Sequence, residues 1–223
     1  MSGLIYILIG AGVAGGVVAF LMTRKQKEQQ ARRDARDAAV HSAEATNDIT
    51  QVGPGGVIKL PPFGDQLGPV ETHVVTRHRM VDDDDMPFYA LECEHGARTL
   101  TVEWSREGGD LYVVAGYEDG QPKLRDLGLE EDDLVRMDDR EKGKFEWDGT
   151  TWHYEYSGEV TYYADDGTQG EVYYAWEFES DDEKRYVSIE RWKRDRGYGV
   201  YVTHAIKPQR IEVFEAGEIK GQA

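Results

Sequence analysis

Two glutamates, Glu92 and Glu177, occupy matching positions in two similar segments of the sequence. Residues 88–94 read FYALECE and residues 173–179 read YYAWEFE. If these segments are strands of two copies of one unit, related by a pseudo-twofold axis, the two carboxylates face each other. A carboxylate pair can exchange protons with a substrate or hold a cation. The alternative is that both are ordinary solvated glutamates, because paired carboxylates matter only where a pocket encloses them.

Strand alternation decides which side chains share a face with these glutamates. It places Phe88 with Glu92 on one face of the first segment, and Tyr173 with Glu177 on the matching face of the second. The opposite faces are more apolar and are expected to form the core; they carry Tyr89, Leu91 and Cys93 in one segment and Tyr174, Trp176 and Phe178 in the other. We therefore expect an acidic, aromatic groove between the two units, where tyrosines beside glutamates can hold an ammonium group or a polyamine.

Recognised catalytic and metal-binding motifs are absent from the sequence. It contains no Walker loop, nucleophile elbow or HExxH motif, and its single cysteine, Cys93, excludes an intramolecular disulfide and a cysteine-rich zinc site. The six histidines lack metal-ligand spacing, and alternation places His73 and His78 on opposite faces of a strand. Residues 82–85, four aspartates, are predicted to be a hairpin tip rather than a calcium loop. We therefore expect no enzyme activity, no catalytic residue, no metal site and no cofactor.

Glycines near the N-terminus have the spacing of a dinucleotide-binding loop but not its surroundings. No second buried strand with a terminal acidic residue follows them, as a ribose site requires. Instead, the run from Leu4 to Met22 carries no charged side chain and has the length of a transmembrane helix. Gly12 and Gly16 form a GxxxG step in it, which allows a homo-oligomer to form through this helix.

Basic residues follow the apolar run and fix its expected orientation. They are Arg24, Lys25, Lys27, Arg32 and Arg33, which are expected to contact anionic lipid headgroups. By the positive-inside rule the N-terminus lies outside and the rest of the chain in the cytoplasm. Because no charge precedes the run and no small-residue cleavage site follows it, we expect an uncleaved single-pass anchor.

Charge and composition divide the chain after the anchor. The net charge is −17, while residues 1–48 carry six Lys or Arg and five Asp or Glu, so the acidic excess falls on the remainder. This balance argues against nucleic acid as a partner. Residues 24–48 are rich in helix formers without Gly or Pro, which predicts a helical stalk. The expected segments are the anchor 1–23, the stalk 24–48, a first β unit 49–137, a second β unit 138–216 and a tail 217–223.

The acidic part of the chain has the pattern of a β protein. Short runs of β-branched and aromatic residues alternate with Gly and Asp clusters, which predicts antiparallel strands, and residues 126–137 predict one short helix. Three segments recur in the same order: 88–94 matches 173–179, 102–104 matches 189–192, and 110–114 matches 199–202. The predicted fold is mainly β, with an N-terminal transmembrane helix and stalk, then a duplicated antiparallel sheet or barrel-like domain with the helix between the repeats.

Several segments of this domain resemble a bacterial family known as domain of unknown function 4178. They read VGPGGVIKL, FYALE, TVEW, DLGLEEDDL, YYAWEFE, SIERW and IKPQRIEVFE. Members of that family resemble accessory proteins of membrane or envelope-stress loci, and some are encoded near membrane-remodelling proteins and spermidine-synthase-like enzymes. The resemblance implies a bacterial inner-membrane location and a membrane-protein or stress-complex partner, but no reaction and no functional residues.

These observations give two expectations for function. The first is a single-pass, membrane-anchored cytoplasmic scaffold or binding protein that is an accessory or regulator of a membrane or envelope-stress complex. The alternative is a polyamine- or cation-binding sensor, or an enzyme, that uses the paired strand glutamates Glu92 and Glu177.

Overall fold

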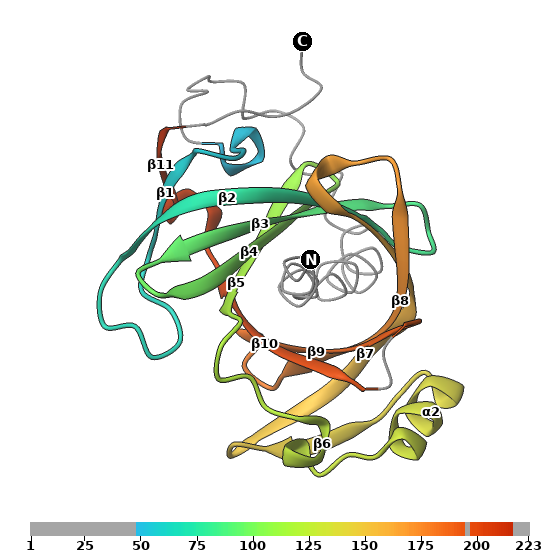
Figure 1. Cartoon of the computed structure of the whole chain (residues 1–223). Helices are drawn as coiled ribbons and strands as arrows, with labels where there is room; N and C mark the ends of the chain where they lie inside the picture. Colours follow the sequence, from blue (N-terminus) through green and yellow to red (C-terminus); the bar gives the residue numbers. More distant parts are fainter. Residues whose placement is uncertain (1–47, 195–196, 216–223) are drawn as a thin grey trace, which may run out of the picture.

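The described part of the chain, residues 48–194 and 197–215, is built around a closed antiparallel β-barrel, seen end-on in Figure 1. In this computed structural model those residues contain eleven strands in one sheet and one α-helix. The order around the barrel is β2-β3-β4-β5-β10-β9-β8-β7, and β7 closes it by pairing with β2. The bounds are β2 Val70–Val81, β3 Pro87–His95, β4 Arg98–Glu107, β5 Asp110–Tyr117, β7 Thr150–Tyr163, β8 Gly170–Ser180, β9 Arg185–Trp192 and β10 Gly199–Ile206.

Three short strands and the helix flank the barrel. β1 (Val57–Leu60) pairs with the first residues of β2, β11 (Glu212–Glu215) pairs with β1, and β6 (Lys144–Trp147) pairs with the first residues of β7. The helix α2 (Glu131–Arg140) lies between β5 and β6 in the chain. Short 3-10 turns complete the path: η2 Ile49–Gln51, η3 Leu124–Leu127, η4 Ala164–Asp166 and η5 Pro208–Arg210.

The helix α2 begins and docks for local reasons. Its first turn is acidic, which complements the partial positive charge of a helix N-terminus. The Asp133 carboxylate also accepts a hydrogen bond of 2.9 Å from the Glu130 N–H, satisfying a donor that the helix leaves free. Leu134 is fully buried and fixes the helix to the rest of the domain.

The strands β2 to β5 and β7 to β10 follow the same pairing plan. A β-bulge at residue 75 interrupts the pairing of β2 with β3, and one at residue 155 interrupts that of β7 with β8. After the bulges, Thr76 lies opposite Glu92 and Tyr156 lies opposite Glu177. Glu92 and Glu177 therefore occupy equivalent register positions in the two groups of strands.

Apolar side chains pack in three clusters, one inside the barrel and two on its outer face. The inner cluster includes Met80, Phe88, Val114, Val160 and Tyr173. The outer face of β3, β4 and β5 is covered by η2 and β1 through side chains such as Ile49 and Ile58. The outer face of β8 and β9 packs against η3, α2 and β6 through side chains such as Leu127, Leu134 and Phe145.

Closure of the sheet corrects the expected groove. The face of β3 and β8 predicted to form the core is buried, through side chains such as Leu91 and Phe178. The opposite face is buried as well: Phe88, Tyr173 and Glu177 expose at most 2% of their surface. These side chains point into the barrel, where strands on every side contribute to the packing, so they do not line an open groove.

The mainly β class and the single short helix between the two groups of strands are confirmed within the described residues. No helix among them has the length and apolar composition needed to cross a membrane. The predicted anchor, headgroup contacts and stalk lie outside the described residues; they comprise Leu4, Gly12, Gly16, Met22, Arg24, Lys25, Lys27, Arg32, Arg33 and the remainder of 24–47.

Candidate functional site

His78 on β2 is the centre of a hydrogen-bonded chain that reaches into the barrel. Its Nδ1 accepts a hydrogen bond of 3.1 Å from the Asp165 backbone N–H and lies 2.8 Å from the Tyr162 hydroxyl. Because a peptide N–H can only donate, we assign Nδ1 as the acceptor and place the ring proton on Nε2. Nε2 then donates to Thr76 Oγ1, at 2.9 Å.

The chain ends on the carboxylate of Glu92. Thr76 Oγ1 donates to Glu92 Oε2 at 3.1 Å, and His78 Nε2 lies 3.6 Å from the same oxygen. The nearby His78 imidazole lowers the pKa of Glu92, outweighing the opposite effect of partial burial, and the hydrogen bond from Thr76 lowers it further. The side chain is 30% exposed, so the result is an ionised carboxylate held in one orientation and still reachable from solvent.

A second carboxyl, that of Glu118, lies close enough to respond to the charge of Glu92. Glu118 follows β5, where its backbone N–H donates to Thr99 O at 3.0 Å, and its Oε1 accepts from Thr101 Oγ1 at 3.3 Å. Burial, and then the charge of Glu92, raise the pKa of Glu118 to about 7. We call these two side chains the Glu92–Glu118 pair. Two carboxyls whose pKa values are moved apart can act as base and acid. They can also lose the remaining proton to solvent when a cation binds between them.

The equivalent position in the second half of the barrel is closed. By register, Tyr156 takes the place of Thr76, and Gly158 takes the place of His78. The Tyr156 hydroxyl lies only 1.9 Å from where a Cβ on residue 158 would stand, so it fills the space that a side chain there would need. That hydroxyl donates to Asp83 in the β2–β3 turn, which holds the ring across the glycine.

Glu177 shares the inside of the barrel with two other buried glutamates. Its Oε1 accepts a hydrogen bond of 2.8 Å from Ser188, and it is fully buried. Burial and the nearby Glu190 raise the pKa of Glu177 well above its usual value, and burial with Glu190 and Glu177 does the same for Glu103. Burial therefore disfavours the charged forms of Glu103 and Glu177, because isolated charges are costly in so apolar a place.

The structure brings together only two of the four residues predicted to line one groove. Phe88 belongs to the inner cluster with Tyr173, whose ring stacks on Trp192 at 4.6 Å between centroids. Glu92 interacts with His78 and Thr76, whereas the pKa of Glu177 is raised by the charge of Glu190. Glu92 and Glu177 thus interact with different side chains, and Glu118 is the carboxyl that responds to the charge of Glu92.

The partners of Glu92 were missed because no sequence pattern marks them. Thr76, His78, Thr101 and Tyr162 come from three different strands, and Glu118 from a loop. Among the described residues, no three His, Cys, Asp or Glu side chains are grouped so as to hold a metal ion. The one cysteine, Cys93, is buried as a free thiol in an outer cluster.

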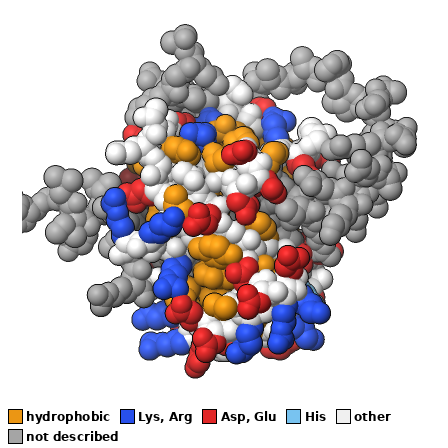
Figure 2. Space-filling view, turned by 90° about the vertical axis from the view of Figure 1, so that its right-hand side faces the viewer, with side chains coloured by type: hydrophobic (Ala, Val, Ile, Leu, Met, Phe, Trp, Pro, Cys, Tyr) orange, Lys and Arg blue, Asp and Glu red, His pale blue; other side chains and the backbone are white. Residues whose placement is uncertain are grey.

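Charged side chains of both signs are interspersed on one face of the domain (Figure 2). On the face shown in Figure 2, Lys and Arg side chains lie among Asp and Glu side chains, and no large area carries one sign of charge. Ion pairs also join β7 and β8 to the residues that follow β9, including Lys193 with Glu159 at 3.3 Å and Arg194 with Glu171 at 3.2 Å. Exposed pairs of this kind contribute little to stability.

The sequence of the barrel strands matches a known family. The model of a family described as Domain of unknown function (DUF4178) matches residues 70–208, a stretch that runs from the start of β2 past the end of β10. Searches of curated proteins and of solved structures found no match. The description of the family gives no reaction or ligand, so the function has to be argued from the side chains.

Proposed function

The chain belongs to the family of domain of unknown function 4178, and we propose that its barrel binds an organic cation such as a polyamine at the Glu92–Glu118 pair. One observation carries this proposal: an ionised, oriented and partly exposed carboxylate stands beside a second carboxyl that retains its proton up to about pH 7. An ammonium group is the ligand whose charge and hydrogen-bond donors complement such a pair.

Binding of the cation is coupled to loss of a proton. Near neutral pH, Glu118 is about half protonated, since its pKa is about 7. A positive charge placed between the two carboxyls favours the ionised form of Glu118, so the proton leaves as the ammonium group enters. Thr76, itself hydrogen-bonded to His78, keeps Glu92 in position throughout, because these hydrogen bonds do not depend on the ligand.

Isothermal titration calorimetry of the full chain with putrescine and with spermidine tests this proposal. Titration in two buffers of different ionisation enthalpy counts the protons released. The wild type is expected to bind with release of a fraction of one proton near pH 7. Glu118→Gln is expected to bind without proton release, and Glu92→Gln to lose binding.

The matched control is Glu159→Gln, which removes one negative charge from an exposed ion pair on β7. It is expected to bind like the wild type. Absence of binding to the wild type, or equal binding by Glu92→Gln and Glu159→Gln, contradicts the proposal.

We further propose that the chain is a single-pass protein of a bacterial inner membrane, with the barrel in the cytoplasm, where it is an accessory or regulator of a membrane or envelope-stress complex. The uncharged run Leu4–Met22 and the basic residues after it support this placement. A fluorescent protein fused to the C-terminus should be fluorescent and sediment with membranes, and deletion of residues 1–23 should release it. Sedimentation of the deletion variant with membranes contradicts the anchor.

We also infer that the two groups of barrel strands are copies of one duplicated unit. Their equal pairing order, their bulges at residues 75 and 155 and the register equivalence of Glu92 with Glu177 support this inference. On this account the first copy retains an open carboxylate, whereas Tyr156 closes the second.

A further inference from the structure

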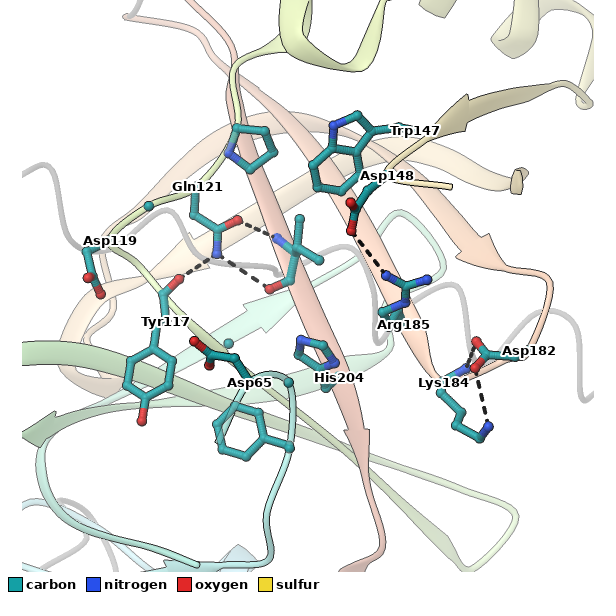
Figure 3. A pocket seen from close by; sticks show the side chains of 16 residues that line it. Asp65, Tyr117, Asp119, Gln121, Trp147, Asp148, Asp182, Lys184, Arg185 and His204 are labelled. Carbon is teal, nitrogen blue, oxygen red and sulfur yellow. Dashed lines mark hydrogen bonds and ion pairs between the residues drawn. The ribbon is translucent and has the colours of Figure 1, made fainter. Parts of the chain in front are cut away.

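A pocket of about 740 Å³ lies on the outside of the barrel, where β5 meets β10. It is separate from the Glu92–Glu118 pair, because neither glutamate lines it. Its walls come from the loop after β1, the segment after β5, the β6–β7 turn and the segment around the start of β9. Figure 3 shows the side chains that converge on it from these elements.

The pocket exists because the first residues of β10 extend past the end of β5, to which β10 is antiparallel. Beyond Tyr117, the side-chain amide of Gln121 takes the place of a strand, since its Oε1 accepts from the Val202 N–H at 2.8 Å and its Nε2 donates to Tyr117 O. The two strands approach closely just before this point: a Cβ on Gly116 would lie 2.6 Å from Val202 O. The opening beyond Gln121 is thus part of a well-defined backbone arrangement.

One wall of the pocket offers a carboxylate among aromatic rings. Figure 3 places Asp65 between Tyr117 and His204, and the Phe63 ring stacks on Tyr117 at 5.9 Å. Burial and then Arg185 lower the pKa of His204, so its ring is neutral near pH 7. The Arg98 guanidinium lies over the Tyr117 ring, 3.6 Å from its centroid, and pairs with Asp119 at 2.9 Å. Asp65 accepts a hydrogen bond from Gln66 and, among the described residues, has no basic side chain within ion-pair distance. A carboxylate with no ion-pair partner can receive an ammonium group of a ligand.

The opposite wall carries two basic side chains. Arg185 Nη1 lies 3.7 Å from Asp148 Oδ2, and Lys184 Nζ lies 3.3 Å from Asp182 Oδ2. Lys184 is 75% exposed and Asp148 is 69% exposed. Exposed, long ion pairs contribute little, so a carboxylate of a ligand can replace either acidic partner. The guanidinium group, whose Nη2 already donates to Thr150 Oγ1, can then bind the ligand carboxylate through Nη1.

We propose that this pocket binds a zwitterionic ligand of short-peptide size, with its ammonium group at Asp65 and its carboxylate at Arg185 and Lys184. The arrangement of charge carries the proposal, because Asp65 and the two basic residues stand on opposite sides in Figure 3. The volume sets the size class: pockets of 300 to about 1,000 Å³ take ligands much larger than one amino acid. Trp147 on the upper wall supplies an apolar surface for the middle of such a ligand.

The tripeptide Gly-Phe-Gly, with free ends, is the probe for this site, and calorimetry on the full chain is the assay. The same peptide acetylated at its N-terminus, and the same peptide amidated at its C-terminus, each lack one charge. Each modification is expected to weaken binding about tenfold, the effect of losing one charge-assisted hydrogen bond. Equal binding of the free and blocked peptides, or no binding of the free peptide, overturns the proposal.

Variants identify which wall holds which end of the peptide. Asp65→Asn, in an exposed loop, is expected to weaken the free peptide about tenfold and to leave the acetylated peptide unaffected, because the same contact is already missing. Lys184→Gln is expected to weaken the free peptide but not the amidated one. Asp84→Asn, an exposed charge outside the pocket, is the matched control. If Asp65→Asn binds the free peptide like Asp84→Asn, the assignment is wrong.

Tripeptide binding at this pocket does not depend on polyamine binding at the Glu92–Glu118 pair. Glu92→Gln, which should lose polyamine binding, is expected to bind the tripeptide like the wild type, since Glu92 does not line this pocket. Loss of tripeptide binding in Glu92→Gln would contradict the assignment of two separate sites.

Discussion

Replacement of Glu118 by glutamine should change how the stability of the protein depends on pH. In the folded chain the pKa of Glu118 is about 7, against 4.5 for an unperturbed glutamate. Between these two values the folded state keeps a proton that the unfolded state has lost. The free energy of unfolding therefore falls as the pH rises through this window, and the full penalty remains at higher pH. A glutamine side chain does not titrate, so the Glu118→Gln variant lacks this contribution.

The size of the effect follows from the shift. One pKa unit corresponds to about 1.4 kcal/mol, so a shift from 4.5 to about 7 gives an upper limit of about 3.4 kcal/mol. Glu118 is only partly buried, and solvent screening reduces the effect. We expect about half of the limit, roughly 1.7 kcal/mol.

Urea denaturation of the full chain at a series of pH values is the assay for this prediction. The stability of Glu118→Gln relative to the wild type should rise by roughly 1.7 kcal/mol between about pH 4.5 and pH 8. Buried Glu103 and Glu177 also titrate, but they are present in both proteins and cancel in the difference. Glu159→Gln, on the surface, should show a nearly constant difference. A constant difference for Glu118→Gln as well would refute the raised pKa and the reasoning built on it.

Three further predictions concern the frame of the barrel. Gly116→Ala should lower the free energy of unfolding by about 1 to 3 kcal/mol, because its Cβ would lie 2.6 Å from the Val202 carbonyl oxygen; an unchanged urea midpoint would contradict this. Arg77→Ala should lower the free energy of unfolding by about 3 kcal/mol and speed proteolysis near residues 48–52. The reason is that the guanidinium group donates to the Thr50 and Val52 carbonyls and lies 4.6 Å from the centroid of the Tyr89 ring. Cys93 is buried and its thiol pKa is raised by burial, so labelling by a disulfide reagent should follow the rate of unfolding; fast labelling of the folded chain would be inconsistent with this.

Sequence similarity located the equivalent glutamates but not their neighbours. The segments 88–94 and 173–179 suggested equivalence, and the register agrees, since Ala90 and Ala175 pair with Glu103 and Glu190. The third pair of segments is shifted: Val114 lies opposite Glu103, but Gly199 lies opposite Glu190. The register thus places Val114, the last residue of the first segment, at the position of Gly199, the first residue of the second. Repeated aromatic and β-branched residues fit several registers, and only the pairing decides among them.

The bulge in β2 makes the prediction that His73 and His78 lie on opposite faces wrong. His78 is five positions after His73, an odd number, so regular alternation predicts that the two side chains lie on opposite faces. The bulge at residue 75 adds a residue, and the two histidines lie opposite Glu94 and Ala90, which share one face of β3. The sequence around Val75 contains no glycine to mark the bulge, and this irregularity is what brings Thr76 and His78 together above Glu92.

Closure of the barrel could not be inferred from periodicity. Both faces of β3 and β8 are buried, and one of them carries glutamates, which usually mark a solvent face. The pairing of β7 with β2, through Tyr162 opposite Met80 and the residues beside them, buries these side chains, and it joins residues that are 80 to 84 positions apart in the chain. Glu118 gave no signal either, because it follows a strand in a loop and acquires its role only through Thr101 and Glu92.

Cation binding at the Glu92–Glu118 pair is tested most sharply by the pKa of Glu118 with and without a polyamine. Carbon NMR of the full chain, with labelled glutamate carboxyls and assignment by Glu118→Gln, follows this titration. Our account predicts a pKa of about 7 without ligand and a clearly lower pKa with saturating spermidine, while Glu159 does not move. A pKa of Glu118 near 4.5, or one that spermidine leaves unchanged, would contradict the claim that this pair binds an organic cation.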